Sequence, residues 1–167
     1  MTLMLDSNVV AALAGRRTRL SPYSYRGDPK VPPFPDDRPI FVFDANCVLC
    51  SRWVDLVLRY DRVGRYRLLS AQSMLGRALY VHYGLDPENY QTNILIIDGV
   101  ALIKAEGSIR LAMGLVFPWS LVGILRVLPR RLADTLYDWV ARNRFRIFGR
   151  RESCYLPHAV DRDRFIA

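Results

Sequence analysis

The stretch that decides the fold is Phe41-Val42-Phe43-Asp44-Ala45-Asn46-Cys47-Val48-Leu49-Cys50. Residues 40–43 form a short apolar, aromatic and β-branched run, which predicts a buried strand. Asn46 can cap a helix, and the apolar residues after it recur at the spacing of one helical face: Leu49, Trp53, Leu56, Val57 and Tyr60. The two cysteines therefore lie at a predicted junction between a strand and a helix.

Two thiols separated by two residues at a helix N-terminus suit thiol–disulfide exchange. The partial positive charge of the helix end favours the thiolate, which is the attacking form. The second thiol is close enough to resolve a mixed disulfide. The helical periodicity predicts that Cys47 is exposed at the N-terminal tip and that Cys50 is half-buried at the edge of the core. Cys47 is thus the predicted nucleophile and Cys50 the predicted resolving thiol.

Three polar side chains are candidates for assisting the reaction of this pair. Asp44 either accepts a proton from Cys50 during resolution or bonds to local backbone donors as a turn residue. Arg52 is expected to face solvent on the helix. His82 is expected to be a surface or packing residue rather than a catalytic base.

The rest of the chain alternates between strand and helix patterns. Strands are predicted at 66–69, 93–97 and 101–104, with the turn dipeptide Asp98-Gly99 between the last two, and helices at 71–83 and 106–116. About 20 residues connect the first two strands, which implies a parallel βαβ unit. The order β-α-β-α-β-β-α predicts an α/β, thioredoxin-like core. Additional C-terminal helices are predicted at 119–128 and 130–147.

Length and composition predict one globular domain. The 167 residues are 51% hydrophobic, but six prolines crowd residues 22–39. We therefore expect a Pro-rich N-terminal arm or linker at 1–39, the domain at 40–157 and a tail at 158–167. The first residues lack the pattern of a secretory signal, and the longest apolar stretch, 111–128, is interrupted by proline, serine and arginine. A soluble, cytoplasmic protein is expected.

The net charge of +8 is unevenly distributed. Residues 126–151 contain eight arginines against two aspartates. Such a region is most often a solvated face, and no nucleic-acid partner is expected. It could also contact a membrane surface or an acidic partner. This leaves a second functional class open, a non-catalytic binding module that presents the Arg-rich region 126–151 and the apolar segment 115–128.

The third cysteine allows a different interpretation of the same thiols. Cys47, Cys50, Cys154 and His158 could form a Cys₃His zinc site, because Cys-x₃-His is an acceptable ligand spacing. Against zinc, the two halves of such a site are about 100 residues apart in the sequence. A chain this apolar also needs no metal to fold. We predict no metal and no cofactor.

Two motifs together carry a family resemblance. One is the stretch from Asp44 to Cys50 before an amphipathic helix, and the other is the run 137–151 followed by Cys154 and Pro157. Over residues 40–157 the chain resembles the DCC (DUF393) family of thiol–disulfide oxidoreductases. Matched to the family's signature, its aspartate and two cysteines fall on Asp44, Cys47 and Cys50, and its late cysteine on Cys154.

The resemblance implies a protein-disulfide reductase type of activity. The expected partners are a disulfide-containing protein or a small thiol substrate, and a reductant for recycling. Two features depart from the expected patterns. Ala45-Asn46 stands where the family usually has glycine and an acidic residue, and the approach to the third strand, 91–93, lacks the cis-proline of thioredoxins. Thr92 is the residue available for that place.

Overall fold

A four-stranded mixed sheet organises the protein. The computed structural model describes residues 20–150 and 159–166. The strands are β1 (Ile40–Phe43), β2 (Arg67–Ser70), β3 (Ile94–Ile97) and β4 (Val100–Ile103), in the spatial order β2-β1-β3-β4. β1 and β2 are parallel, whereas β3 is antiparallel to both β1 and β4. The predicted parallel βαβ unit is therefore confirmed.

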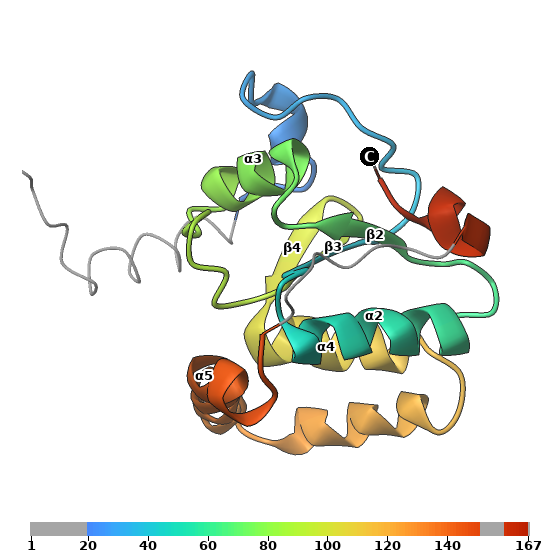
Figure 1. Cartoon of the computed structure of the whole chain (residues 1–167), viewed down its shortest axis with the longest axis vertical. Helices are drawn as coiled ribbons and strands as arrows, with labels where there is room; N and C mark the ends of the chain where they lie inside the picture. The colour runs from blue at the N-terminus through green and yellow to red at the C-terminus, as the bar shows by residue number, and fades with distance from the viewer. Residues whose placement is uncertain (1–19, 151–158, 167) are drawn as a thin grey trace, which may run out of the picture.

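Helices cover both faces of the sheet. α2 (Val48–Tyr60) and α4 (Lys104–Met113) lie on one face, and α3 (Met74–His82) lies on the other (Figure 1). Alternate residues of each strand point to opposite faces, so the core has two halves. Val42 and Leu69 pack with α3, whereas Phe43 and Leu68 pack with α2 and α4. The element order is the predicted β-α-β-α-β-β-α, which confirms the thioredoxin-like α/β core.

The β3–β4 hairpin is as short as the sequence predicts. Asp98 and Gly99 form its two-residue turn, and both have positive φ, 49° and 72°. Two consecutive positive φ angles match the twist of the flanking strands, and aspartate followed by glycine tolerates them well. The turn sets the register in which Ile97 pairs with Val100.

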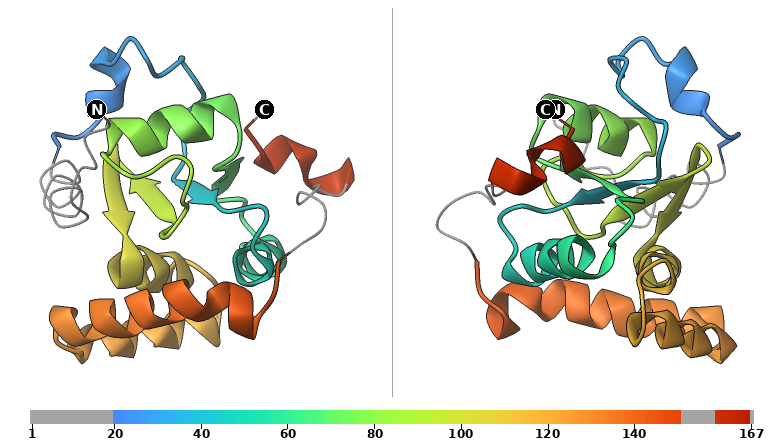
Figure 2. Two further views of the ribbon diagram at one scale, coloured as in Figure 1. Left: turned by 60° about the vertical axis from the view of Figure 1, so that its left-hand side comes forward. Right: turned by 90° about the vertical axis from the view of Figure 1, so that its right-hand side faces the viewer.

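The C-terminal elements form an additional layer over α4. The helix predicted at about 119–128 is present as a 3₁₀ helix, η2 (Trp119–Val127). The predicted helix 130–147 is confirmed as α5 (Arg130–Ile147). Both elements pack on α4, on the side away from the sheet (Figure 2). A short 3₁₀ helix, η3 (Ala159–Arg164), lies in the tail, where the Ile166 N–H donates to the Leu68 carbonyl at the sheet edge.

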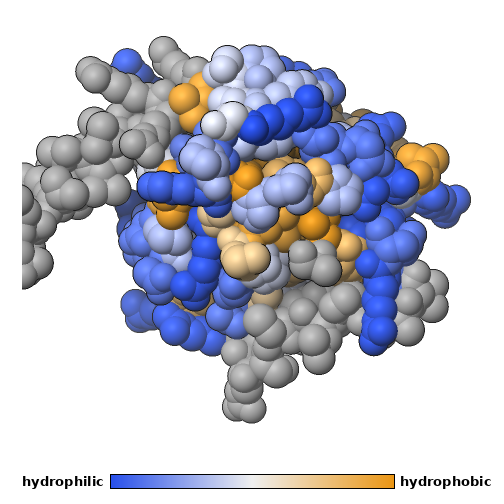
Figure 3. Space-filling model, turned by 90° about the horizontal axis from the view of Figure 1, so that it is seen from above, coloured by the Kyte–Doolittle hydropathy of each residue, from blue (hydrophilic) through white to orange (hydrophobic). Residues whose placement is uncertain are grey.

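The described part of the Pro-rich segment, residues 20–39, packs on the α3 side of the domain. Its 3₁₀ turn, η1 (Ser24–Gly27), buries Tyr25. His82 of α3 hydrogen-bonds to Ser24 Oγ at 3.0 Å and to Asp28 Oδ2 at 2.7 Å. His82 is therefore a packing residue, as expected. From the α3 side, hydrophilic side chains surround a central group of apolar ones (Figure 3).

Within the described residues, no helix combines the length and the apolar character needed to cross a membrane.

Candidate thiol site at the start of α2

The cysteine pair lies where β1 passes into α2, as predicted. Cys47 is the N-cap residue of α2, with extended backbone angles (φ −97°, ψ 123°), and its carbonyl accepts the Ser51 N–H at 2.9 Å. Asn46, the predicted cap, precedes this position by one residue. Cys50 follows in the first turn of α2, and both cysteines are free thiols.

The predicted exposure of the pair is wrong. Cys47 has no exposed surface and Cys50 is 3% exposed. The most deeply buried face of α2 runs through Cys50, Val54 and Val57 rather than along the centre of the apolar stripe that begins at Leu49. Leu49 and Trp53, on the predicted apolar stripe, are only half-buried, and the thiols lie on the fully buried side. At the far end of the helix, Trp119 of η2 packs on Tyr60.

A backbone pairing far from α2 in the sequence reaches Cys47. After α5 the chain turns at Gly149, which has a φ of 85°, and Arg150 forms an isolated antiparallel bridge with Cys47. The Arg150 guanidinium lies 4.3 Å from the Phe145 ring centroid, which ties this segment to α5. Arg150, 103 positions later in the sequence, thus contacts the predicted nucleophile.

The surroundings of the two thiols shift their pKa values in opposite directions. The hydrogen bond from the Cys50 thiol is the main cause that lowers the pKa of Cys47 to about 6, with further help from the Cys50 N–H and the Arg144 charge and against the effect of burial. Cys50 is the donor in this interaction, and both that role and burial raise its pKa well above the usual value. The charge of Asp44 opposes ionisation of both thiols. The pair is therefore built as one thiolate and one thiol.

Asp44, the predicted site aspartate, is buried beneath the pair. Its Oδ1 accepts the Asn46 N–H at 3.0 Å and the Gln72 Nε2–H at 2.7 Å, and its Oδ2 accepts Arg144 at 2.9 Å. The bond to Asn46 is the local turn interaction that the sequence left open. Gln72 also accepts the Ala45 N–H at 3.0 Å, so it fixes both the Asp44 carboxylate and the backbone that follows it.

Arg144 is the principal residue that the sequence did not predict. It projects from α5, is 4% exposed, and also donates to the Tyr90 carbonyl. One weak signal exists in the sequence. Arg144 and Tyr137 are seven residues apart and lie on the same side of the helix. Apolar residues lie on the opposite side: Leu132, Leu136 and Trp139. In the fold, the polar side faces the domain.

Thr92 occupies a buried polar corner beside the site. Its Oγ1 accepts the Lys104 N–H at 3.0 Å, and its carbonyl accepts the Tyr80 hydroxyl. The Tyr137 hydroxyl accepts the Asn93 N–H at 3.3 Å. Burial raises the pKa of both the Tyr80 and the Tyr137 hydroxyl.

The other candidate residues lie elsewhere. Arg52 is exposed on α2, as expected. Cys154 and His158 fall outside the described residues, so the proposed Cys₃His set cannot be assembled from the described part. Within that part, no group of three or more histidine, cysteine, aspartate or glutamate side chains could hold a metal ion.

Comparisons with known proteins identify the family of the chain. The family model for DCC1-like thiol-disulfide oxidoreductase matches residues 41–150, a range that includes Asp44, both cysteines and Arg144. The chain belongs to the DCC1-like thiol-disulfide oxidoreductase family. This membership confirms the resemblance seen in the sequence, and the family name indicates thiol–disulfide chemistry.

Two relatives cover most of the chain. The "Uncharacterized protein YuxK" of Bacillus subtilis (strain 168) is 29% identical over 127 residues, which are 76% of this chain and 93% of that protein. The "DCC family protein At1g52590, chloroplastic" of Arabidopsis thaliana is 34% identical over 122 residues, which are 72% of this chain and 71% of that protein. No solved structure matches the chain.

Proposed function

We propose that this protein is a protein-disulfide reductase that uses Cys47 as the nucleophile and Cys50 as the resolving thiol. One observation carries the proposal: two free thiols lie at the N-terminus of α2, where their interaction lowers the pKa of Cys47 to about 6 and raises that of Cys50. At neutral pH the first thiol is therefore ionised and ready to attack, while the second keeps its proton until it is needed.

The reaction has two steps. The Cys47 thiolate attacks one sulfur of a substrate disulfide, the substrate S–S bond breaks, and one substrate thiolate leaves and takes a proton. Cys50 then loses its proton and attacks Cys47 Sγ, which releases the second substrate thiolate and forms the Cys47–Cys50 disulfide. The substrate gains two electrons and the protein loses two. A dithiol reductant returns the pair to the starting state.

Asp44 stays a candidate proton acceptor for Cys50, but its contacts support a positioning role as well. Both carboxylate oxygens already accept hydrogen bonds, from Asn46, Gln72 and Arg144. A proton from Cys50 would have to displace one of these donors. The carboxylate holds Arg144 beside the thiols, and the Arg144 charge helps to lower the pKa of Cys47.

The substrate must reach a buried sulfur. Because Cys47 has no exposed surface, attack requires that the structure opens locally around it, and the chain at Arg150 is one segment that contacts it. A disulfide-containing protein or a small disulfide could then enter. No metal or organic cofactor takes part in the proposed steps.

The test is reduction of insulin and of a small dithiol-probe disulfide in a Cys154→Ser background, so that only the pair can react. We expect turnover with the pair intact and none in Cys47→Ser. Cys50→Ser should accumulate a mixed disulfide on Cys47, detectable by mass spectrometry of the trapped adduct. Circular dichroism of each variant checks that the fold is kept.

Two results would overturn the proposal. One is the absence of turnover by the intact pair with both substrates in the presence of a dithiol reductant. The other is an adduct that forms on Cys50 as readily in Cys47→Ser as it forms on Cys47 in Cys50→Ser.

A further inference from the structure

An apolar stripe on α5 points away from the domain. Leu132, Leu136, Trp139 and Ile147 recur at intervals of about one or two helical turns, so they share one side of the helix. Each of them is more than half exposed. The opposite side of α5 carries the polar residues that face the domain, including Tyr137 and Arg144. The apolar side of this helix is thus the side that the domain does not cover.

A second apolar edge runs along η2. A 3₁₀ helix has three residues per turn, so residues three apart lie above one another. Leu121, Ile124 and Val127 have this spacing and are 53%, 69% and 85% exposed. The other side of η2 packs on α4, where Gly123 lies against Met113. Together with the four residues of the α5 stripe, these residues form the η2–α5 face, a group of seven exposed large apolar side chains, whereas exposed apolar residues scattered singly are ordinary.

The charge of this face is positive. On the helical wheel, Arg142 and Arg146 flank the α5 stripe. Between Glu106 and Glu152 the sequence has two acidic residues, Asp134 and Asp138. Both are paired, Asp134 with Arg130 and Asp138 with Lys104 at 2.8 Å. The carboxylates of α5 therefore leave its flanking arginines uncompensated.

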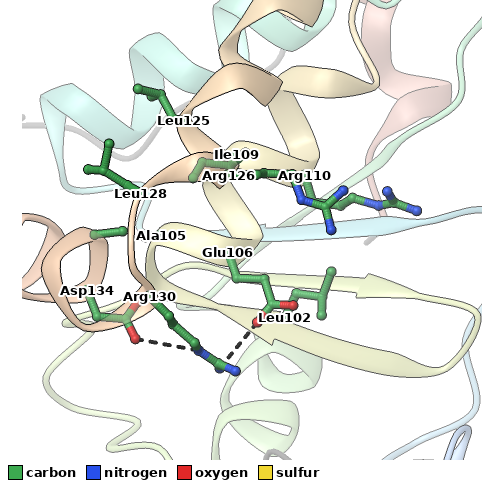
Figure 4. A pocket seen from close by; sticks show the side chains of 11 residues that line it. Leu102, Ala105, Glu106, Ile109, Arg110, Leu125, Arg126, Leu128, Arg130 and Asp134 are labelled. Atoms are coloured by element: carbon green, nitrogen blue, oxygen red, sulfur yellow. Dashed lines mark ion pairs between the residues drawn. The ribbon is translucent and has the colours of Figure 1, made fainter.

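The same charge pattern continues into the groove beside the η2–α5 face. A cavity of about 420 Å³ opens between α4, η2 and α5, with Leu125 and Leu128 in its wall. Arg130 is held there by Glu106 at 3.2 Å and by Asp134 (Figure 4). Arg110 and Arg126 extend side by side elsewhere in the lining, and neither forms an ion pair within the described residues. These two guanidinium groups are available to an external anion.

We propose that the η2–α5 face binds the surface of a membrane that contains anionic phospholipids. Exposed leucine, isoleucine and tryptophan flanked by arginine is the composition of an interfacial helix, whose apolar side enters the headgroup region while arginines contact lipid phosphates. A second copy of the chain fits the face less well, because a symmetric contact would bring the two arginine rims together. The proposal is independent of the thiol chemistry.

The test is co-flotation of the full-length reduced protein with vesicles of phosphatidylcholine alone or of phosphatidylcholine mixed with phosphatidylglycerol. We expect binding to the anionic vesicles that weakens, but persists, as salt rises. Ile124→Asp and Leu132→Asp should each lower the partition coefficient about tenfold. Arg142→Glu should lower it at least about fivefold.

Matched controls come from α3, on the opposite face of the sheet. Met74 is 80% exposed, so Met74→Asp makes the same chemical change away from the η2–α5 face, and Arg77→Glu does the same for charge. Both should bind like the unmodified chain. All of these variants should reduce a soluble disulfide at the unmodified rate, because none of the residues touches the thiols.

Three outcomes would overturn the proposal. The first is no binding to anionic vesicles at any salt concentration. The second is binding that the α3 controls weaken as much as Ile124→Asp and Leu132→Asp do. The third is a concentration-dependent dimer in sedimentation that Leu136→Asp abolishes while vesicle binding is unchanged, which would make the face a self-association surface.

Discussion

Replacing Arg144 by methionine removes one half of a buried ion pair. The Arg144 and Asp44 side chains are 5% and 3% exposed, so both charges are almost fully withdrawn from water. In Arg144→Met the carboxylate keeps two neutral donors but loses its cation, and the Tyr90 carbonyl loses a donor. Breaking a buried pair in this way costs about 3–5 kcal/mol of the free energy of unfolding. With a urea m-value of about 2 kcal/mol/M, the midpoint should fall by about 2 M.

The assay is equilibrium urea unfolding of the reduced protein, followed by circular dichroism. The matched control is Arg142→Met, because Arg142 lies two residues earlier on the same helix and is exposed. We expect its free energy of unfolding to change by no more than about 0.5 kcal/mol. Asp44→Asn combined with Arg144→Met leaves no unpaired charge. The double variant should therefore be more stable than the sum of the single losses predicts, by about 2 kcal/mol.

The reasoning is refuted if Arg144→Met is no less stable than Arg142→Met. It is also refuted if the losses in Asp44→Asn and Arg144→Met simply add. Either result would mean that the carboxylate under the thiols does not depend on the arginine. A loss of stability confined to the buried arginine, with strong coupling to Asp44, supports the geometry described.

Three further outcomes follow from the structure. The folded pKa of Cys47 is about 6, below that of an unfolded thiol, so the unfolded chain binds more protons between the two values. The free energy of unfolding of the reduced protein should therefore rise with pH from about 6 to about 8.5. The urea midpoint of Cys47→Ser should not show this rise. Gly76→Ala would place a Cβ 2.2 Å from the Ser70 carbonyl oxygen, which should lower the free energy of unfolding by about 1–3 kcal/mol and with it the thermal midpoint. Gly27→Ala, whose Cβ meets nothing within 4 Å, should leave the thermal midpoint unchanged. Thr92→Val removes the acceptor of the Lys104 N–H and should lower the free energy of unfolding in urea by about 1–3 kcal/mol. An unchanged urea midpoint would contradict this hydrogen bond.

The core was predictable because local patterns specify it. Residues 40–43 read as a buried strand, Asp98-Gly99 read as a two-residue turn, and the length of the crossover implied parallel strands. All three depend on interactions between residues that are close in the sequence. The same holds for α5, whose extent was predicted to the residue.

The surroundings of the thiols were not predictable in this way. Arg144 lies 100 residues from Asp44, and no periodicity links the two positions. The exposure of Cys47 was predicted wrongly because the helical wheel of α2 considers that helix alone, whereas the chain at Arg150, beyond α5, pairs with Cys47. Local sequence therefore located the cysteine pair at the start of a helix, whereas long-range contacts determine the exposure and the ionisation of its thiols.

The burial of Cys47 limits the rate at which its thiol can be modified. A sulfur with no exposed surface reacts only during the fraction of time that it is uncovered, so its observed rate is the rate of an open thiolate multiplied by the opening equilibrium constant. Every 1.4 kcal/mol that holds the site closed slows small alkylating agents and peroxide tenfold. A disulfide substrate that itself opens the site escapes that penalty. If Cys47 reacts as proposed, its burial would protect an ionised cysteine from irreversible oxidation and still leave it available to a substrate able to open the site.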